Sequence, residues 1–379
     1  MIAYLIVFSA AAATTFVVTP VIRHLAIRFG AVDQPSDRKV HPVATPTMGG
    51  LAMYVGFVVA LGVSRLLPFF GLMNDGTSEP LAALVTCTLM VGLGVVDDRR
   101  GINWLTKLTA QIFIGGALIL VGVQVIYTYL PGSAGIVNVS PDLAVPLTIA
   151  WVVVVCNAVN LVDGLDGLAA GMVGIAATAF FVYQVRSPGT FGLASSAGLL
   201  SAIAAGICLG FLPWNFHPAK IFMGDTGAML LGMLLAIATI SGAARRELPP
   251  SPGDLAVLLI PILTPLLVLF VPFLDVGLAI IRRVRRGQGI GHADKEHLHH
   301  RLMDIGHSHR QAVLLMYVWT GLIAVSGLAV GFINGRLVVG LVLVGAVTLF
   351  LVTALPRLTE RRRAEPPSTG GGGDPGAGA

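Results

Sequence analysis

Four short clusters of polar residues interrupt an otherwise strongly apolar sequence, and their residue types could bind a cation and phosphates. The clusters are the pair Asp97-Asp98, the run from Asn157 to Gly167, the run from Phe222 to Gly227, and the histidine-rich loop from Gly291 to His309. Carboxylate and amide oxygens are hard ligands, which favours Mg²⁺ or Mn²⁺ over zinc. A carboxylate that reaches hydrocarbon costs roughly 2.5–3.5 kcal/mol, so these side chains should face protein, water or a cation.

The first cluster ends an apolar stretch. Asp97 and Asp98 carry two like charges that repel each other unless a basic group or a metal ion lies between them. Arg99 and Arg100 follow directly, so a solvated helix end is the alternative interpretation of this pair.

The second cluster joins two apolar stretches through only four residues, of which Asp163 and Asp166 are two. Their i, i+3 spacing puts both carboxylates on one side of the turn if the turn is helical. Asn157 and Asn160 lie one and two turns earlier on a similar face, and buried amides need hydrogen-bond partners. The pattern predicts a polar stripe that reaches a ligand; a purely structural polar network is the alternative.

The third cluster precedes another apolar stretch. Gly224 and Gly227 allow the backbone to approach a ligand, and the N-terminus of a helix attracts phosphate. The carboxylate of Asp225 can hold the magnesium ion that accompanies a phosphate. The alternative is that Asp225 simply caps the helix.

The fourth cluster holds six of the nine histidines within 18 residues: His292, His297, His299, His300, His307 and His309. Five arginines lie in or next to the same loop: Arg282, Arg283, Arg285, Arg286 and Arg301. We interpret the loop as an anion-binding arm. Zinc binding by the His-x-His-His pattern and simple solvated histidines are the alternatives.

Helices that cross a membrane must position these clusters. The chain has 379 residues, of which 55% are hydrophobic and only 11% are charged. That composition excludes a soluble enzyme, and the number of apolar stretches excludes a receptor with a single anchor. We expect an all-α polytopic membrane protein of about 11 transmembrane helices, at 2–22, 49–70, 80–96, 107–126, 144–162, 167–185, 196–214, 226–243, 254–281, 313–333 and 337–355.

The basic residues predict the orientation of these helices. The loops after odd-numbered spans, together with the C-terminal tail, hold 19 of the 24 Lys and Arg residues. The positive-inside rule then places the N-terminus outside, the C-terminus in the cytoplasm, and all four clusters at the cytoplasmic face of the plasma membrane. We expect one transmembrane catalytic domain over residues 1–356 and a disordered cytoplasmic tail over 357–379. The three cysteines lie in apolar stretches and predict neither a disulfide nor a zinc site.

Taken together, six motifs resemble the polyprenyl-phosphate N-acetylhexosamine-1-phosphate transferase family, which includes the WecA/TagO enzymes and the MraY translocase. Each motif is weak alone, but six in the same order are specific. They are Asp33-x-Pro35 with Arg38-Lys39-x-His41, the segment 45–50, Asp97-Asp98, the run 157–167, Asn215 with the run 218–227, and His297-Leu-His299-His300-Arg301.

The resemblance implies transfer of a sugar 1-phosphate from a UDP-sugar to a membrane polyprenyl phosphate, with release of UMP. It implies Mg²⁺ as cofactor, with Mn²⁺ as the alternative, and a first step of a lipid-linked cell-envelope polysaccharide pathway. Asp225 would ligate the metal with Asp98 as a second ligand, and Asp97 or Asp98 would deprotonate the acceptor phosphate. His297, His299 and His300 would offset charge on the sugar-side phosphate. Substrate contacts would come from Lys39, Thr47, Asn157, Asn160, Asp163, Asp166, Asn215, Phe222 (against uracil), Gly224 and Arg301.

The histidine loop distinguishes the branches of the family. Members of the MraY type share a His-His-His-Phe-Glu run, whereas residues 293–301 read Ala-Asp-Lys-Glu-His-Leu-His-His-Arg, which is similar to the WecA/TagO pattern. We therefore expect UDP-GlcNAc as the donor, with UDP-MurNAc-pentapeptide as the alternative. A cation-coupled transporter, a rival from another class, would carry its acids near mid-span. Nothing predicts nucleic-acid binding, and the sequence leaves the oligomeric state open, a homodimer included.

One apolar stretch, 254–281, is longer than a bilayer requires and contains three prolines. We expect it to break near Pro272 and to open a lateral groove for the polyprenyl tail, a Pro-kinked but closed span being the alternative.

Overall fold

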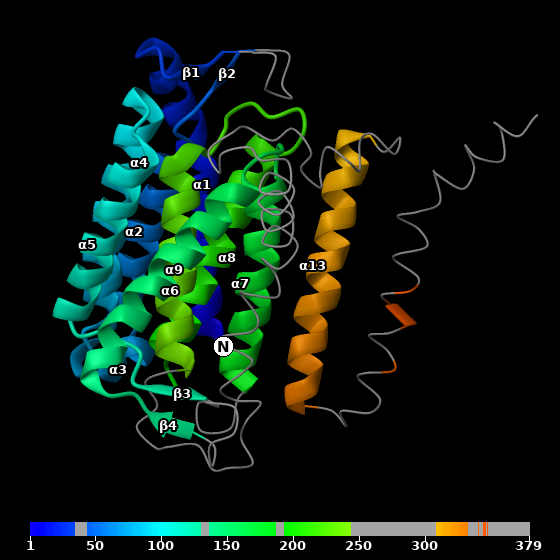
Figure 1. The fold of residues 1–379 in the computed structure, drawn as a ribbon. Coiled ribbons are helices and arrows are strands. Elements are labelled where there is room, and N and C mark those ends of the chain that lie inside the picture. The colour runs from blue at the N-terminus through cyan, green and yellow to red at the C-terminus, as the bar shows by residue number, and fades with distance from the viewer. Residues whose placement is uncertain are drawn as a thin grey trace, which may run out of the picture.

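The computed structural model describes residues 1–34, 44–129, 136–186, 193–243 and 308–332, with short pieces beyond 339. The described chain is a bundle of long helices that run roughly side by side (Figure 1). The helices are α1 (Ile2–Arg28), α2 (Gly50–Leu66), η1 (Pro68–Phe70), α3 (Gly71–Gly76), α4 (Glu79–Arg100), α5 (Trp104–Leu120), α6 (Pro141–Val162), α7 (Leu168–Arg186), α8 (Ser196–Asn215), α9 (Gly224–Ala243) and α13 (His309–Phe332).

Six of the described helices are long and apolar enough to cross a membrane: α1, α4, α6, α7, α8 and α9. A seventh span results if α2 and the helical segment 68–76, which meet at a bend of 88°, are counted as one. The described part of the chain is mostly helical, with six or seven candidate spans, as expected for a polytopic membrane protein. The stretch 254–281, most of 337–355 and the tail lie outside the described residues, so the count of eleven spans, the orientation of the termini and the break at Pro272 stay predictions.

Several helices extend past the predicted apolar stretches. α1 continues to Arg28 and α4 continues to Arg100, because backbone hydrogen bonding does not stop where the apolar residues stop. The extension of α4 matters for the site, since it makes Asp97 and Asp98 part of the last helical turn.

Two short antiparallel strand pairs were not predicted. β1 (Val32–Asp33) pairs with β2 (Thr45–Pro46), and β3 (Tyr127–Tyr129) pairs with β4 (Ile136–Asn138). The two pairs lie at opposite ends of the bundle (Figure 1). They are too short for a periodic pattern to reveal them.

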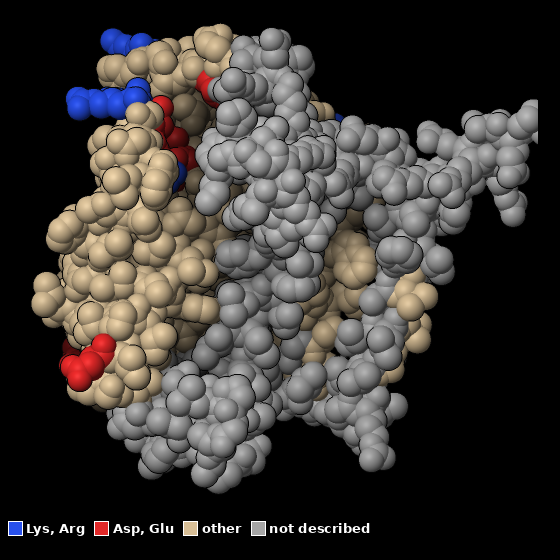
Figure 2. Space-filling view, viewed as in Figure 1, with Lys and Arg blue, Asp and Glu red and all other residues tan. Residues whose placement is uncertain are grey.

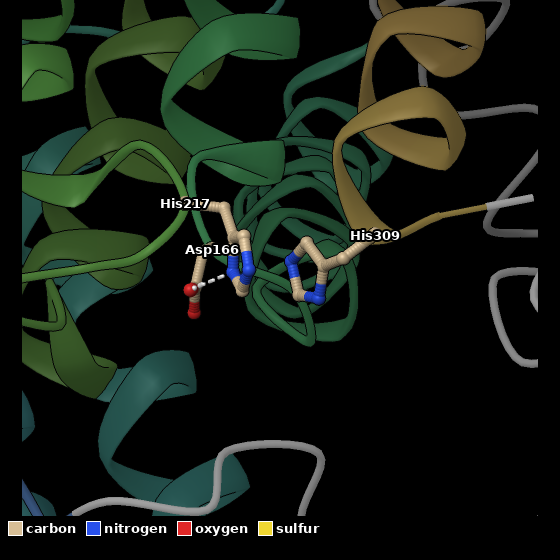
Figure 3. Close-up of side chains that lie close together, drawn as sticks. All are labelled: Asp166, His217 and His309. Atoms are coloured by element: carbon tan, nitrogen blue, oxygen red, sulfur yellow. Dashed lines mark hydrogen bonds and ion pairs between the residues drawn. The ribbon is translucent and has the colours of Figure 1, made fainter.

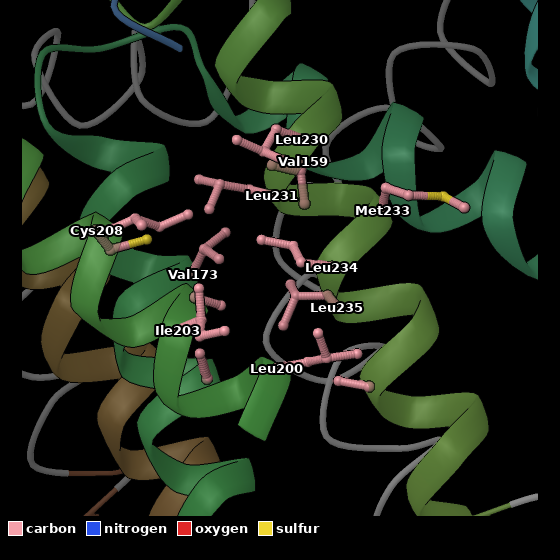
Figure 4. Packing of buried hydrophobic residues seen from close by; sticks show 14 of the residues in the cluster. Val159, Val173, Leu200, Ile203, Cys208, Leu230, Leu231, Met233, Leu234 and Leu235 are labelled. Carbon is pink, nitrogen blue, oxygen red and sulfur yellow. The ribbon is translucent and has the colours of Figure 1, made fainter. Parts of the chain in front are cut away.

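α9 is the central helix of the bundle. It contacts α2, α4, α6, α7 and α8, and its apolar side chains, such as Leu230, Leu231 and Leu234, are fully buried (Figure 4). No charged residue follows Asp225 in α9, so every face of the helix can pack against a neighbour. The N-terminal end of α9 is therefore surrounded by the ends of other helices.

Small residues set the distances between α9 and its neighbours. A methyl group added to Gly94 of α4 would lie 2.5 Å from the Cα of Thr226, and one added to Gly232 would lie 2.5 Å from the Cα of Cys156 in α6. Close approach of this kind is how helices pack in membranes, where small side chains let backbones meet. Because Gly94 stands one turn before Asp98, the contact brings the acidic end of α4 to the start of α9.

Candidate functional site

The predicted acidic residues meet at one end of the bundle, where α4 and α6 end and where α5 and α9 begin. Figure 2 shows acidic side chains in a recess at that end, with basic side chains on the adjoining surface. The site is thus assembled from helix termini rather than from the middle of any span.

Asp98 caps helix α9 from a neighbouring helix. Its Oδ1 accepts a hydrogen bond from the backbone N–H of Asp225 at 2.8 Å. Its Oδ2 accepts from the backbone N–H of Thr226 at 3.1 Å and from the Thr226 hydroxyl at 2.6 Å. A carboxylate at this position satisfies free helix donors and interacts favourably with the positive end of the helix dipole. The alternative interpretation of Asp225 as the cap is therefore wrong, because Asp98 supplies the capping carboxylate.

Gly224 makes this capping contact geometrically feasible. It adopts a positive φ of +69°, and an added Cβ would lie 2.5 Å from Oδ2 of Asp98 and 2.8 Å from the Thr47 hydroxyl. Gly224 was predicted to let the backbone approach a ligand; in the structure, the groups close to it are the side chains of Asp98 and Thr47. A side chain at this position would push the carboxylate away from the helix.

The segment 45–50 is held against the start of α9 by main-chain hydrogen bonds. Phe222 N–H donates to the carbonyl of Pro46 at 2.8 Å, and the N–H groups of Gly49 and Gly50 donate to the carbonyls of Phe222 and Met223, each at 2.9 Å. These bonds explain why two motifs far apart in sequence belong to one site. They position Thr47 beside Gly224.

The carboxylate of Asp225 points to two partners from other helices. Its Oδ2 lies 2.5 Å from Nζ of Lys107, and its Oδ1 accepts a hydrogen bond of 2.5 Å from the amide of Asn160. Lys107 Nζ also lies 2.8 Å from Oδ2 of Asp97 and 3.3 Å from the amide oxygen of Asn160. The second oxygen of Asp97 accepts from the N–H of Ile102 at 2.9 Å. Lys107 therefore joins both carboxylates and the amide at one point.

Asp163 follows α6 and belongs to the same electrostatic group. Burial raises the pKa of Asp163 well above its usual range, and the charges of Asp225, Asp98 and Asp166 raise it further. Four carboxylates, those of Asp97, Asp98, Asp163 and Asp225, thus converge here, and the described part of the chain places a single ammonium group, that of Lys107, among them.

This donor set fits a divalent cation with hard ligands. Oxygens of Asp97, Asp225 and Asn160 surround the ammonium group of Lys107, and Asp163 is close enough to interact electrostatically with Asp225. The excess of carboxylate over basic charge favours an added cation. Asp98 fits less well as a ligand than predicted, because both of its oxygens already accept hydrogen bonds from α9.

The remaining predicted residues divide between the edge of the site and the frame that supports it. Asn157 donates to the Gln111 side chain at 2.6 Å and to the carbonyl of Val153 at 2.8 Å, one turn away from Asn160. Asn215 is buried; it accepts from the N–H of Gly167 at 3.1 Å and donates to the carbonyl of Ile221 at 3.0 Å. Asn215 therefore ties the turn after α6 to the segment before α9.

Asp166 points to a different set of partners. Its Oδ2 lies 2.7 Å from Nδ1 of His217 and accepts from the N–H of Ala219 at 3.1 Å. The predicted residues Lys39, His297, His299, His300 and Arg301 lie outside the described residues.

Sequence reasoning missed Lys107, Thr226 and Gln111. Lys107 is the first residue of the predicted stretch 107–126, and it stands in the first turn of the apolar helix α5. A lysine at the start of an apolar span, near several unpaired carboxylates, is the pattern that could have revealed it. No such pattern marks Thr226 or Gln111, because their partners, Asp98 and Asn157, reach them only through the packing of the helices.

Fold and site together define a polytopic helical membrane protein with an oxygen-rich acidic site at the helix ends. Residues 80–243 match the family model described as glycosyl transferase family 4. The chain is 42% identical over 357 residues to a decaprenyl-phosphate N-acetylglucosaminephosphotransferase of Mycobacterium leprae, a match that covers 93% of this chain and 89% of the relative. It is 36% identical over 318 residues, 84% of this chain and 82% of the relative, to a probable undecaprenyl-phosphate N-acetylglucosaminyl 1-phosphate transferase of Bacillus subtilis.

A third relative represents the other branch. A phospho-N-acetylmuramoyl-pentapeptide-transferase of Desulforudis audaxviator is 35% identical over 264 residues, 63% of this chain and 76% of the relative. The chain belongs to the polyprenyl-phosphate N-acetylhexosamine-1-phosphate transferase family, and the resemblance drawn from the six motifs is confirmed.

Proposed function

We propose that this protein transfers GlcNAc-1-phosphate from UDP-GlcNAc to a membrane polyprenyl phosphate and releases UMP, as the first step of a lipid-linked cell-envelope polysaccharide pathway. The observation that carries the proposal is the meeting of Asp97, Asp225, Asn160 and Lys107 at the start of α9, in a chain 42% identical to a GlcNAc-phosphotransferase along 93% of its length. Such a site would bind phosphate groups next to the membrane surface.

The comparisons favour GlcNAc over MurNAc-pentapeptide as the transferred group. The relative named for MurNAc-pentapeptide transfer matches 63% of this chain at 35% identity, whereas the relative named for GlcNAc transfer matches 93% at 42%. The sequence of the histidine loop also favours GlcNAc.

Mg²⁺ is the cofactor that the oxygen donors at the start of α9 fit, and Asp225 would hold it. When bound there, the ion would neutralise charge on the diphosphate of the donor. Mn²⁺ has the same ligand preference and is the alternative.

The side chains at the start of α9 would have separate roles in the reaction. In the transfer, an oxygen of the lipid phosphate forms a bond to the β-phosphorus of UDP-GlcNAc while the bond from that phosphorus to the UMP oxygen breaks. In-line positioning and charge neutralisation dominate such a reaction. Asp97 is the better candidate to accept a proton from the acceptor phosphate, because Asp98 accepts three hydrogen bonds that hold the start of α9, whereas Asp97 accepts one from Ile102 and pairs with Lys107. Lys107 supplies positive charge to the phosphates.

The other predicted residues complete the proposal. Asn160 and Asp163 would hold the nucleoside end, with Phe222 against the uracil. Asp166 was predicted for the same role, but its Oδ2 faces His217 and Ala219 instead. Lys39, Thr47 and the loop residues His297, His299, His300 and Arg301 would line the phosphate path. The positive-inside count supports a cytoplasmic location for the whole site.

The test is a transfer assay with protein purified in detergent. Radiolabelled UDP-GlcNAc, polyprenyl phosphate and Mg²⁺ should give a labelled lipid and an equal amount of UMP, and the Asp225→Asn variant should give neither. UDP-MurNAc-pentapeptide, offered in parallel, should remain unreacted. Failure with every UDP-hexosamine would overturn the proposal.

A further inference from the structure

Three potential metal ligands from separate segments lie together beside the site described above. Asp166 stands in the turn after α6, His217 follows α8, and His309 is the first residue of α13. Each offers one ligand atom, and these atoms all lie within 4.8 Å of one another (Figure 3). Sequence reasoning did not connect these three residues.

The two histidines contact each other and only one of them contacts the carboxylate. Nδ1 of His217 lies 2.7 Å from Oδ2 of Asp166, and the ring of His217 stacks on that of His309 with centroids 4.1 Å apart. Nε2 of His309 is shielded from solvent and has no hydrogen-bond partner among the described residues. A shielded ring nitrogen without a hydrogen-bond partner among the described residues is available to bind a ligand.

Other hydrogen bonds hold the three segments in place without using the ligand atoms. The guanidinium Nε of Arg310 donates to the carbonyl of His217 at 3.1 Å, and the hydroxyl of Tyr317 donates to the carbonyl of Gly167 at 2.5 Å. These bonds fasten α13 to the turn after α6 and to the segment after α8. The ligand set is therefore positioned by the backbone and not only by its own contacts.

We propose that Asp166, His217 and His309 form a binding site for a transition-metal ion, with Zn²⁺ as the reference ion. Two imidazoles and a carboxylate suit zinc, nickel, cobalt or copper, whereas Mg²⁺ prefers oxygen alone. Ligand bonds of about 2.0–2.2 Å put two ligand atoms of a tetrahedral ion about 3.4 Å apart. The ligand atoms now lie within 4.8 Å of one another, so the histidine rings have to rotate to close around the ion. The ion takes the place of the proton between Asp166 and His217.

The bound ion would clamp α13 to the turn that carries Asp163 and Asp166. This site differs in ligand chemistry from the oxygen-rich cluster around Asp225. The proposal does not depend on the transferase activity, and its test uses neither nucleotide nor lipid.

The experiment measures zinc binding by the full-length protein. Protein purified without a histidine tag and stripped of metal is dialysed against Zn²⁺ in excess Mg²⁺, so that oxygen-rich sites are filled. We expect wild type to bind one more equivalent of zinc than His309→Gln. The matched control is His24→Gln, since His24 is exposed on α1 and outside the cluster. The control should bind as much zinc as wild type. Histidines of the loop 291–307 are present in all three proteins and cancel in the comparison.

A second readout excludes a loss of binding through misfolding. Zn²⁺ should raise the thermal unfolding midpoint of wild type and of His24→Gln but not of His309→Gln or His217→Gln, and the two cluster variants should match wild type in the absence of zinc. If His309→Gln does not fold, His217→Gln decides alone. Equal zinc stoichiometry in wild type and both cluster variants, or a midpoint in wild type that zinc does not raise, would overturn the proposal.

Discussion

The capping contact between α4 and α9 predicts that replacing Asp98 or Asp97 with asparagine has different effects on activity and thermal stability. Asp98 accepts three hydrogen bonds from the first residues of α9, whereas Asp97 accepts one from Ile102 and one from Lys107. We expect Asp98→Asn to lose both activity and thermal stability. We expect Asp97→Asn to lose activity, by on the order of 100-fold or more if Asp97 is the general base, with little change in stability.

The loss of stability expected for Asp98→Asn follows from the hydrogen bonds that the carboxylate accepts. Asparagine keeps one acceptor oxygen but turns an NH₂ group toward at least one of the donors that Asp98 now satisfies. A hydrogen bond to a charged group contributes about 1.5–3 kcal/mol, and the interaction of the charge with the helix dipole about 0.3–1 kcal/mol. The variant should therefore lose roughly 2–4 kcal/mol. At about 2–4 °C per kcal/mol, the unfolding midpoint should fall by on the order of 5–10 °C.

Both properties can be measured on the same preparations. Tryptophan fluorescence during heating in detergent gives the midpoint, and release of UMP gives the activity. Thr226→Val, which removes one donor to Asp98 and keeps the side-chain volume, should lower the midpoint by a smaller amount. If Asp98→Asn unfolds at the wild-type temperature and is inactive, Asp98 acts on substrate or metal and the capping argument is refuted.

Three further changes test the rest of the cluster. Asp225→Asn should abolish activity with little effect on the unfolding midpoint, because Asp98 holds the helix start; wild-type activity that survives EDTA would show that the metal role is wrong. Gly224→Ala should lower both activity and midpoint, because the residue has a φ of +69° and its Cβ would lie 2.5 Å from Oδ2 of Asp98; wild-type values in both assays would contradict this. Lys107→Met leaves Asp97 and Asp225 without their ammonium partner, so Mg²⁺ titration should raise its midpoint more than that of wild type. Equal Mg²⁺ responses of the two proteins would mean that Lys107 does not occupy a cation position.

Over the described residues, the sequence predicted the long apolar helices and the meeting of Asp97, Asn160 and Asp225 at one end of the bundle. Asn160 of α6 and Asp225 of α9 were expected in one site, and their side chains are hydrogen-bonded. Charged and amide residues at the ends of apolar stretches are few, so their meeting at one end of the bundle follows from the order of the spans alone.

The partners of each side chain could not be predicted from the sequence. α9 is apolar around its whole circumference, so no periodicity shows which face meets α4 and which meets α6. The cap from Asp98 to Thr226 spans 128 residues and depends on the close approach at Gly94. The contact of His217 with His309 likewise depends on how α13 packs on α7.

The capping contact also changes how the site can hold a phosphate. The sequence suggested that the N-terminus of α9 attracts the phosphate, but Asp98 already uses the N–H groups of Asp225 and Thr226, and the N–H of Gly227 donates to the carbonyl of Met223 at 3.3 Å. The first turn of α9 therefore orients Asp225 instead of binding the anion. Among the described residues, Lys107 is then the cation at the point where the carboxylates meet. A diphosphate brings more negative charge than one ammonium group can offset, so we expect productive binding to need an added divalent cation and the basic residues of the loop 291–309.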